Sequence, residues 1–327
     1  MSALSSLAFM ALAAPAALLG ASHLMTRKLA REARALVPPV GQFCDTPHGR
    51  IHYVDIGPRD AQPLVMIHGL SGQLQHFTYA LADALAKDYR VIALDRPGCG
   101  YSTRATDAMA RLPEQAKTLL SCLDKLGIHQ PVLVGHSLGG AVSLAMALQA
   151  PEKIRGLALL APLTHPAAQG ADAFIGLIVN TSLMRHLMAQ TVAVPTAKRT
   201  AAPVLNQIFA PEPCPDDFLL KAGGALGLRP ESFVAASADA SFLYPAIETQ
   251  AARYAKGLST PGAILFGAED AILDPVAQGN AMQVYGLDCE IAPKRGHMLP
   301  ITAPTLCEDF IRATLAKLPT AQQPVDE

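Results

Sequence analysis

Short apolar runs alternate with longer amphipathic stretches along most of this chain. The runs have the length of β-strands, and several are followed by segments whose apolar residues recur at helical spacing, as at Ala116, Leu119, Leu120 and Leu123. Such alternation predicts an α/β fold with a doubly wound, mostly parallel sheet. We expect strands at residues 50–56, 63–67, 90–94, 131–134, 154–160, 263–267 and 289–292, the first of them antiparallel.

The strand signals stop after Leu163 and return only at Pro261. We interpret residues 164–256 as a helical cap inserted into a core formed by residues 44–163 and 257–319, with a tail at 320–327. In the first half of the cap, apolar residues recur at helical spacing and charges are few. This spacing predicts that the cap packs onto the core through these residues. Taken together, they should also line part of an apolar pocket. The apolar positions are Phe174, Leu177, Ile178, Leu183, Met184, Leu187 and Met188.

The N-terminal segment is apolar and is followed at once by basic residues. Residues 1–26 contain no Asp, Glu, Lys or Arg, whereas Arg27, Lys28, Arg31 and Arg34 come next. A hydrophobic helix of this length can span a bilayer, and its basic flank is expected on the cytoplasmic side. We therefore predict a membrane anchor, with residues 27–43 as a linker and the globular part in the cytoplasm. The alternatives are a signal peptide cleaved before export, and a merely amphipathic or buried helix.

The hexapeptide at residues 135–140 lies between an apolar run and a helical stretch, which is the setting of a nucleophile elbow. Ser137 is then the nucleophile, and Gly135 and Gly139 leave room for a sharp turn from strand to helix. The competing interpretation is a glycine-rich turn with a serine N-cap.

An elbow requires three further features, and the chain has a candidate for each. Residues 68–72 follow the strand at 63–67, so that the amide of Leu70, beside Gly69, would join that of Leu138 in an oxyanion hole. Asp270 follows the strand at 263–267 and is the expected acid, whereas Asp274 precedes Pro275 and is typical of a helix N-cap. Glu269 is expected to be solvated. His297 follows the last strand and is the expected general base.

These motifs together resemble the α/β-hydrolase superfamily, in the capped branch that includes esterases, lipases, C–C bond hydrolases and cofactor-free haloperoxidases. The resemblance covers residues 44–318 and implies an eight-stranded sheet with helices on both faces. It also implies structural roles for His68 and His136. The matching positions are His68-Gly69, Asp95-Arg96-Pro97-Gly98-Cys99-Gly100-Tyr101-Ser102, Gly135-His136-Ser137-Leu138-Gly139-Gly140, Asp270 and Gly296-His297-Met298.

Composition excludes several other classes of protein. A net charge of −1 and 5% aromatic residues leave no nucleic-acid-binding footprint. The six cysteines have neither zinc-ligand spacing nor a disulfide pattern, so we expect no metal and no cofactor.

The sequence thus predicts a serine hydrolase that cleaves carboxylic esters of small, hydrophobic or lipid-like substrates through an acyl-enzyme on Ser137. A C–C bond hydrolase of a vinylogous diketone would use the same three residues. Basic residues placed to bind a substrate carboxylate would distinguish it. A non-catalytic binding module is the remaining alternative, although no member of the triad is missing.

Overall fold

The computed structural model describes residues 3–167 and 171–319, with side chains from residue 17 to 167 and from 174 to 319. Its centre is an eight-stranded sheet with the strand order β1-β2-β4-β3-β5-β6-β7-β8. β2 runs antiparallel to β1 and β4, and every other pairing is parallel. The strands are β1 (Gln42–Thr46), β2 (Gly49–Ile56), β3 (Pro63–Ile67), β4 (Arg90–Leu94), β5 (Val132–Gly135), β6 (Gly156–Leu160), β7 (Gly262–Gly267) and β8 (Leu287–Ala292).

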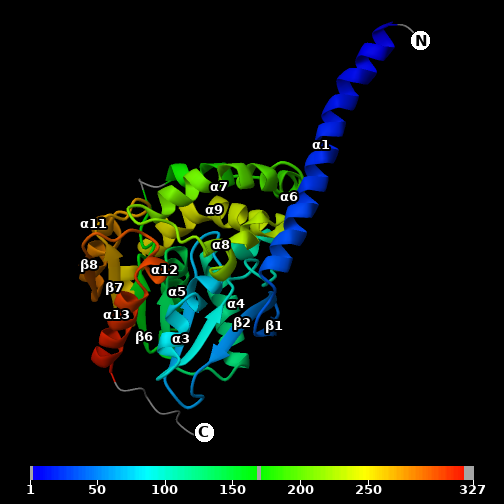
Figure 1. The fold of residues 1–327 in the computed structure, drawn as a ribbon. Helices are drawn as coiled ribbons and strands as arrows, with labels where there is room; N and C mark the ends of the chain where they lie inside the picture. The colour runs from blue at the N-terminus through cyan, green and yellow to red at the C-terminus, as the bar shows by residue number, and fades with distance from the viewer. Residues whose placement is uncertain (1–2, 168–170, 320–327) are drawn as a thin grey trace.

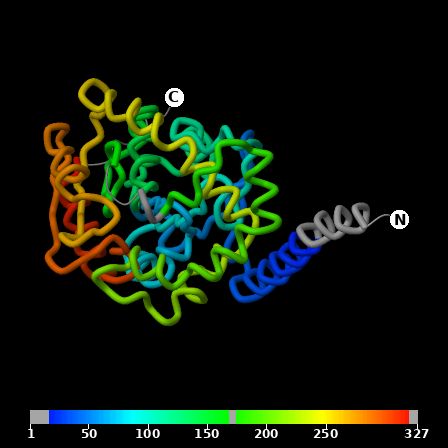
Figure 2. Tube along the Cα trace, turned by 90° about the horizontal axis from the view of Figure 1, so that it is seen from above, coloured from blue at the N-terminus to red at the C-terminus, as the bar shows by residue number. Residues whose placement is uncertain are grey.

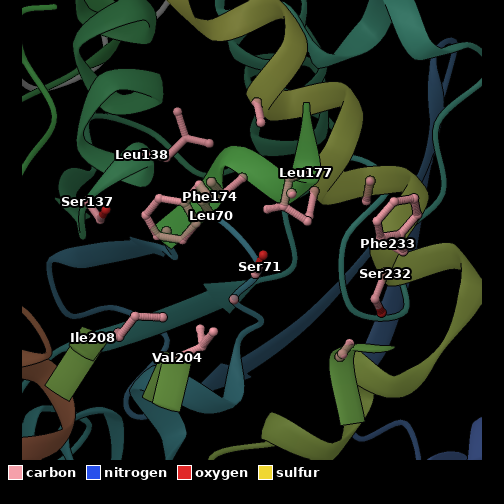
Figure 3. Close-up of a pocket in the computed structure, with 18 of the residues that line it drawn as sticks. Leu70, Ser71, Ser137, Leu138, Phe174, Leu177, Val204, Ile208, Ser232 and Phe233 are labelled. Atoms are coloured by element: carbon pink, nitrogen blue, oxygen red, sulfur yellow. The ribbon is translucent and has the colours of Figure 1, made fainter. Parts of the chain in front are cut away.

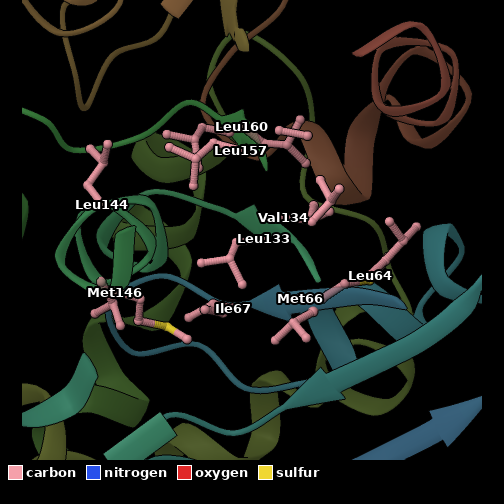
Figure 4. Packing of buried hydrophobic residues seen from close by; sticks show 14 of the residues in the cluster. Leu64, Met66, Ile67, Leu133, Val134, Leu144, Met146, Leu157 and Leu160 are labelled. Atoms are coloured by element: carbon pink, nitrogen blue, oxygen red, sulfur yellow. The ribbon is translucent and has the colours of Figure 1, made fainter. Parts of the chain in front are cut away.

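The predicted α/β class and mostly parallel sheet are confirmed. The central strands are buried on both faces, which explains their unbroken apolar runs. Leu64, Met66, Leu133 and Leu157 interdigitate in this core (Figure 4). Helix α5 (Leu138–Gln149) packs against β3, β5 and β6 and is buried on all sides up to Leu148. It is therefore apolar around its whole circumference.

The other core helices form two groups. α4 (Leu112–Lys125) packs beside α5, whereas α13 (Pro304–Lys317) packs beside α3 (Leu81–Leu85). Five short elements of the core lie in the connections between strands, and a sixth, α12 (Leu299–Thr302), lies between β8 and α13. The five are α2 (Gln75–Thr78), η1 (Asp107–Ala110), η2 (Pro151–Lys153), α11 (Pro275–Gln278) and η5 (Asn280–Tyr285).

A helical cap follows β6 and lies across one end of the sheet (Figure 1). Between β6 and β7, the described residues contain helices and no strand. The cap helices are η3 (Ala171–Leu177), α6 (Ser182–Gln190), α7 (Ala193–Phe209), α8 (Phe218–Lys221), η4 (Gly224–Leu228), α9 (Pro230–Ala251) and α10 (Tyr254–Gly257). Seen from above, the green and yellow cap helices lie over the body of the chain (Figure 2).

The chain begins with the long helix α1 (Ala3–Leu36), which packs beside the cap. Ser22 Oγ and Thr26 Oγ1 both donate to the carbonyl of Thr191, at 2.8 and 2.9 Å. Ala33 and Val37 pack against Ala225 and Leu226 of η4. α1 extends beyond the cap as an arm (Figure 1).

The linker predicted at residues 27–43 is wrong in extent. Residues 27–36 continue α1, and β1 already begins at Gln42. These residues stay helical because their apolar side chains, such as Leu29 and Ala30, are buried where α1 packs against the rest of the protein. Among the residues whose side chains are described, none of the helices combines the length and apolarity needed to cross a membrane. The tail predicted at 320–327 lies outside the described residues.

Candidate active site

Ser137 occupies a strained turn between β5 and α5. Its backbone has φ 53° and ψ −122°, a conformation that costs free energy in any residue with a side chain. The two flanking glycines permit the turn because other backbone atoms pass close by. A Cβ atom at Gly139 would lie 1.9 Å from the carbonyl oxygen of Ile67, and one at Gly135 would lie 2.5 Å from Ser143 Oγ. The nucleophile elbow expected from the sequence therefore has the predicted geometry.

His297 links Ser137 to Asp270. Its Nε2 lies 3.0 Å from Ser137 Oγ, and its Nδ1 lies 2.8 Å from Asp270 Oδ2. A carboxylate only accepts hydrogen bonds, so Nδ1 carries the proton and Nε2 faces the hydroxyl as an acceptor. The imidazole is 4% exposed, and the carboxyl group is fully buried. The three residues thus form the constellation that activates a serine for attack.

The second oxygen of Asp270 is fixed by its own loop. Asp270 Oδ1 accepts hydrogen bonds from the amides of Ile272 and Leu273, at 2.8 and 2.9 Å. Asp274 instead caps α11, where its Oδ1 accepts from the amides of Val276 and Ala277. The prediction that Asp274 is an N-cap is confirmed, and Glu269 is exposed as expected.

The amides of Leu70 and Leu138 are the expected oxyanion donors. Within the described residues, neither amide donates to a protein acceptor. Leu138 is the first residue of α5, where the helix terminus favours negative charge. Gly69 brings the other loop close, since a Cβ atom there would lie only 2.9 Å from Ser137 Cβ. Both loops next to Ser137 therefore carry a backbone amide that is free to bind an oxyanion.

His68 and His136 are structural neighbours of this site. His136 Nε2 donates to the carbonyl of His297 at 3.0 Å, which holds the loop that carries the imidazole. Burial, and then the nearby His297, lowers the pKa of His136 well below its ordinary value. Burial and the adjacent Arg96 do the same to the pKa of His68. Both rings are therefore neutral near pH 7.

Comparison with known proteins identifies the fold family. A family model described as alpha/beta hydrolase fold matches residues 62–304. The chain belongs to the α/β-hydrolase family.

Relatives of this α/β hydrolase carry several activities in their names. A stretch of 130 residues is 39% identical to 2-hydroxymuconate semialdehyde hydrolase of Pseudomonas sp. (strain CF600) and covers 38% of this chain and 46% of that protein. A stretch of 286 residues is 24% identical to uncharacterized carboxylesterase nap of Bacillus subtilis (strain 168), covering 82% and 84% of the two chains. The chain spans less than half the length of the first curated relatives it matches.

A solved structure supports the same fold. The structure of naproxen esterase (carboxylesterase NP) from Bacillus subtilis superposes with a TM-score of 0.61 at 20% identity, covering 88% of this chain and 96% of that one. At this identity, the likeness concerns the fold alone.

An apolar cavity of about 940 Å³ lies between the cap of this α/β hydrolase and Ser137. Phe174, Leu177, Val204 and Ile208 reach into it from the cap (Figure 3). Apart from histidines, the one charged residue that lines it in the described part of the chain is the exposed Lys198. A volume of this size accommodates a drug-sized ligand.

The expectation that the apolar positions of the first half of the cap pack onto the core and line part of the pocket is wrong for three of them. Leu183, Met184 and Leu187 lie on the outer side of α6 and are 82%, 48% and 56% exposed. α6 is rotated this way because Arg185 turns inward, where it pairs with Asp107. The buried side of α6 therefore carries Arg185 and Ala189 in place of the three leucine and methionine side chains.

Two residues near the site had no role in the sequence interpretation. Arg96 lies in the motif at residues 95–102 and is fully buried beside the oxyanion loop, and Asp239 of the cap helix α9 contacts it. The only sequence signal for Arg96 was its place within the family motif. Asp239 had none, because a single acidic residue in a helix is usually solvated.

Proposed function

We propose that this α/β hydrolase is a serine esterase that cleaves carboxylic esters of hydrophobic substrates. The observation that carries the proposal is the bridge from Ser137 through His297 to Asp270 at the floor of an apolar cavity. The sequence relative named as a carboxylesterase, which aligns over most of both chains, supports the same activity.

In this mechanism His297 Nε2 takes the proton of Ser137 while Oγ attacks the ester carbonyl carbon. The amides of Leu70 and Leu138 hold the resulting oxyanion, and Asp270 stabilises the imidazolium. The imidazolium returns the proton to the departing alcohol, which leaves an acyl group on Ser137. Water, deprotonated by His297, then releases the acid and restores the serine.

A C–C bond hydrolase acting on a vinylogous diketone is the second candidate. The relative named 2-hydroxymuconate semialdehyde hydrolase favours it. The cavity weighs against it, because within the described residues no buried lysine or arginine lines the wall to bind a substrate carboxylate. We therefore place the ester substrate first.

The test combines labelling with a substrate panel on the purified full chain. Fluorophosphonate should label the wild type at Ser137, and p-nitrophenyl esters should be hydrolysed. Ser137→Ala should lose both activities, on the order of 10⁶ in kcat, while the thermal midpoint stays nearly unchanged. Turnover of a vinylogous diketone without any ester turnover would transfer the assignment to the C–C hydrolase. Labelling at a different serine would remove Ser137 from the mechanism.

We further propose that α1 attaches the enzyme to a membrane with the catalytic domain on the cytoplasmic side. The uncharged residues 1–26 and the basic residues after them support this. Exposed apolar side chains on α1, at Leu18, Leu19 and Leu24, support it as well.

Because Ser22 and Thr26 of α1 bind the cap, the truncation that tests the anchor should remove residues 1–17 only. The full chain should sediment with membranes and resist carbonate extraction, whereas the truncated chain should be released and keep its esterase activity. N-terminal sequencing of the mature protein distinguishes this from export, since a cleaved signal would leave a new N-terminus near His23. A full chain that stays in the supernatant would exclude the anchor.

A further inference from the structure

A buried carboxylate on the cap lies between two arginines of the core. Asp239, on α9, accepts a hydrogen bond from Arg96 Nη1 at 2.7 Å and one from Arg104 Nη1 at 2.9 Å. The side chains of Asp239 and Arg96 are fully buried, and that of Arg104 is 5% exposed. Buried alanines around Asp239 let α9 lie close to the core. A buried charge of this kind needs at least one oppositely charged partner, because a buried charge without one strongly destabilises the fold.

Arg96 also binds the oxyanion loop, residues 68–72, which contains the Leu70 amide. Its Nε donates to the carbonyl of His68 and its Nη2 to the carbonyl of Gly69, both at 2.9 Å. The backbone amide of Arg96 donates to His68 Nε2 at 3.0 Å. The His68 ring therefore carries its proton on Nδ1, which donates to the Gly69 carbonyl at 2.8 Å.

The Gly69 carbonyl belongs to the same peptide unit as the Leu70 amide. A trans peptide is planar, so its C=O and N–H groups point in opposite directions. Two donors that fix the Gly69 carbonyl therefore also fix the direction in which the Leu70 N–H points. A cationic donor on the carbonyl also polarises the peptide and strengthens its N–H as a donor.

We propose that Asp239 is a positioning residue that couples the cap to the oxyanion hole, by holding Arg96 against the peptide that carries the Leu70 amide. The inference rests on the proposed esterase function and goes beyond it, because it assigns the cap a part in transition-state stabilisation as well as in substrate binding. Its signature is a loss of kcat rather than of substrate affinity, since the oxyanion exists only in the transition state.

The experiment compares three variants of the full chain. Asp239→Asn keeps the shape of the side chain and removes its charge. Arg96→Met removes the link to the loop and leaves Asp239 paired with Arg104, so that no buried charge is left alone. Arg104→Met is the matched control, since it removes the other partner of the same carboxylate without touching residues 68–70.

Each variant is measured for kcat and KM on p-nitrophenyl butyrate, and for inhibition by an aryl trifluoromethyl ketone, whose adduct with Ser137 places an oxyanion in the hole. Asp239→Asn and Arg96→Met should lower kcat by about 10- to 100-fold and raise the ketone inhibition constant by a similar factor. KM should stay within about threefold, because ground-state binding is unaffected. Arg104→Met should change each of these values by no more than about twofold.

Circular dichroism and thermal melting establish which variants fold, and Arg96→Met carries the test if Asp239→Asn does not. Unchanged kcat and ketone inhibition in a folded variant would overturn the coupling. An equal loss of kcat and of ketone inhibition in Arg104→Met would also overturn it, because the effect would then come from altered packing of the cap on the core. A wild type that neither hydrolyses esters nor reacts with fluorophosphonate would instead refute the esterase proposal, and the coupling with it.

Discussion

Replacing Gly69 with alanine should slow ester hydrolysis severely while leaving the fold intact. The added Cβ would lie 2.9 Å from Ser137 Cβ, and 3.4 Å from both His136 Nδ1 and the His136 carbonyl oxygen. Carbon atoms in contact prefer separations of 3.5–4.0 Å, so one side of this contact must move by at least about 0.6 Å.

The loop rather than the serine is expected to move. Ser137 is held between β5 and α5, and the next turn at Gly139 already touches the Ile67 carbonyl. A displaced loop carries the Leu70 amide away from the oxyanion. Removing one such donor typically costs about 3–4 kcal/mol of transition-state stabilisation, or on the order of 10²–10³ in kcat.

The assay is steady-state hydrolysis of p-nitrophenyl butyrate, with the thermal midpoint measured in parallel. Gly20→Ala, in α1, is the matched control, because its Cβ would meet no atom within 4 Å and the residue does not line the cavity. It should keep both kcat and the thermal midpoint of the wild type. A Gly69→Ala enzyme with wild-type kcat would show that the loop accommodates the methyl group without displacing the Leu70 amide from the oxyanion.

Three further predictions follow from the geometry of the site and the cavity. Asp270→Asn should lower kcat by roughly 10⁴, whereas Asp274→Asn should be nearly neutral because asparagine also caps helices; reversed severities in a kinetic comparison would exchange their roles. Burial lowers the pKa of His76 to about 4, so the unfolded chain binds more protons than the folded chain between pH 6.5 and 4, and stability falls as the pH drops through that range. His76→Phe should therefore remove about 2 kcal/mol of the loss in unfolding free energy between pH 7 and 5, measured by urea denaturation, and an unchanged loss would contradict the burial argument. Ile208→Glu, in the cavity wall, should raise KM for long acyl esters more than for acetate esters. The difference corresponds to a loss of up to about 0.8 kcal/mol of binding free energy per methylene of the acyl chain. The exposed Leu187→Glu should leave the dependence of KM on chain length unchanged.

The sequence alone was enough for the features that depend on neighbouring residues. The turn at residues 135–140 could be predicted because its small residues and flanking apolar run are contiguous. The N-cap role of Asp274 could be predicted for the same reason, since an aspartate before a proline and a helix acts on the next few amides. The alternation of strand and helix signals likewise predicted the sheet, because buried parallel strands must be apolar on both faces.

The predicted start of the linker was wrong because a run of charged residues does not by itself end a helix. The basic residues after position 26 suggested a linker, yet they continue α1 with their charges outside and Leu29 and Ala30 buried. Packing against the cap stabilised a helix whose local sequence gave no clear reason to extend so far.

Which distant groups meet depends on how the elements pack against one another. His297 reaches Ser137 across 160 positions of sequence, and Arg96 reaches Asp239 across 143. The order of the triad residues along the chain made the first contact predictable, but nothing local distinguishes Asp239 from a solvated acid. Likewise, the spacing of apolar residues in α6 indicated a helix without indicating its rotation, which the buried Arg185 set. Local propensity specifies the elements, whereas the pairing of buried charges depends on surfaces that exist only after the elements have packed.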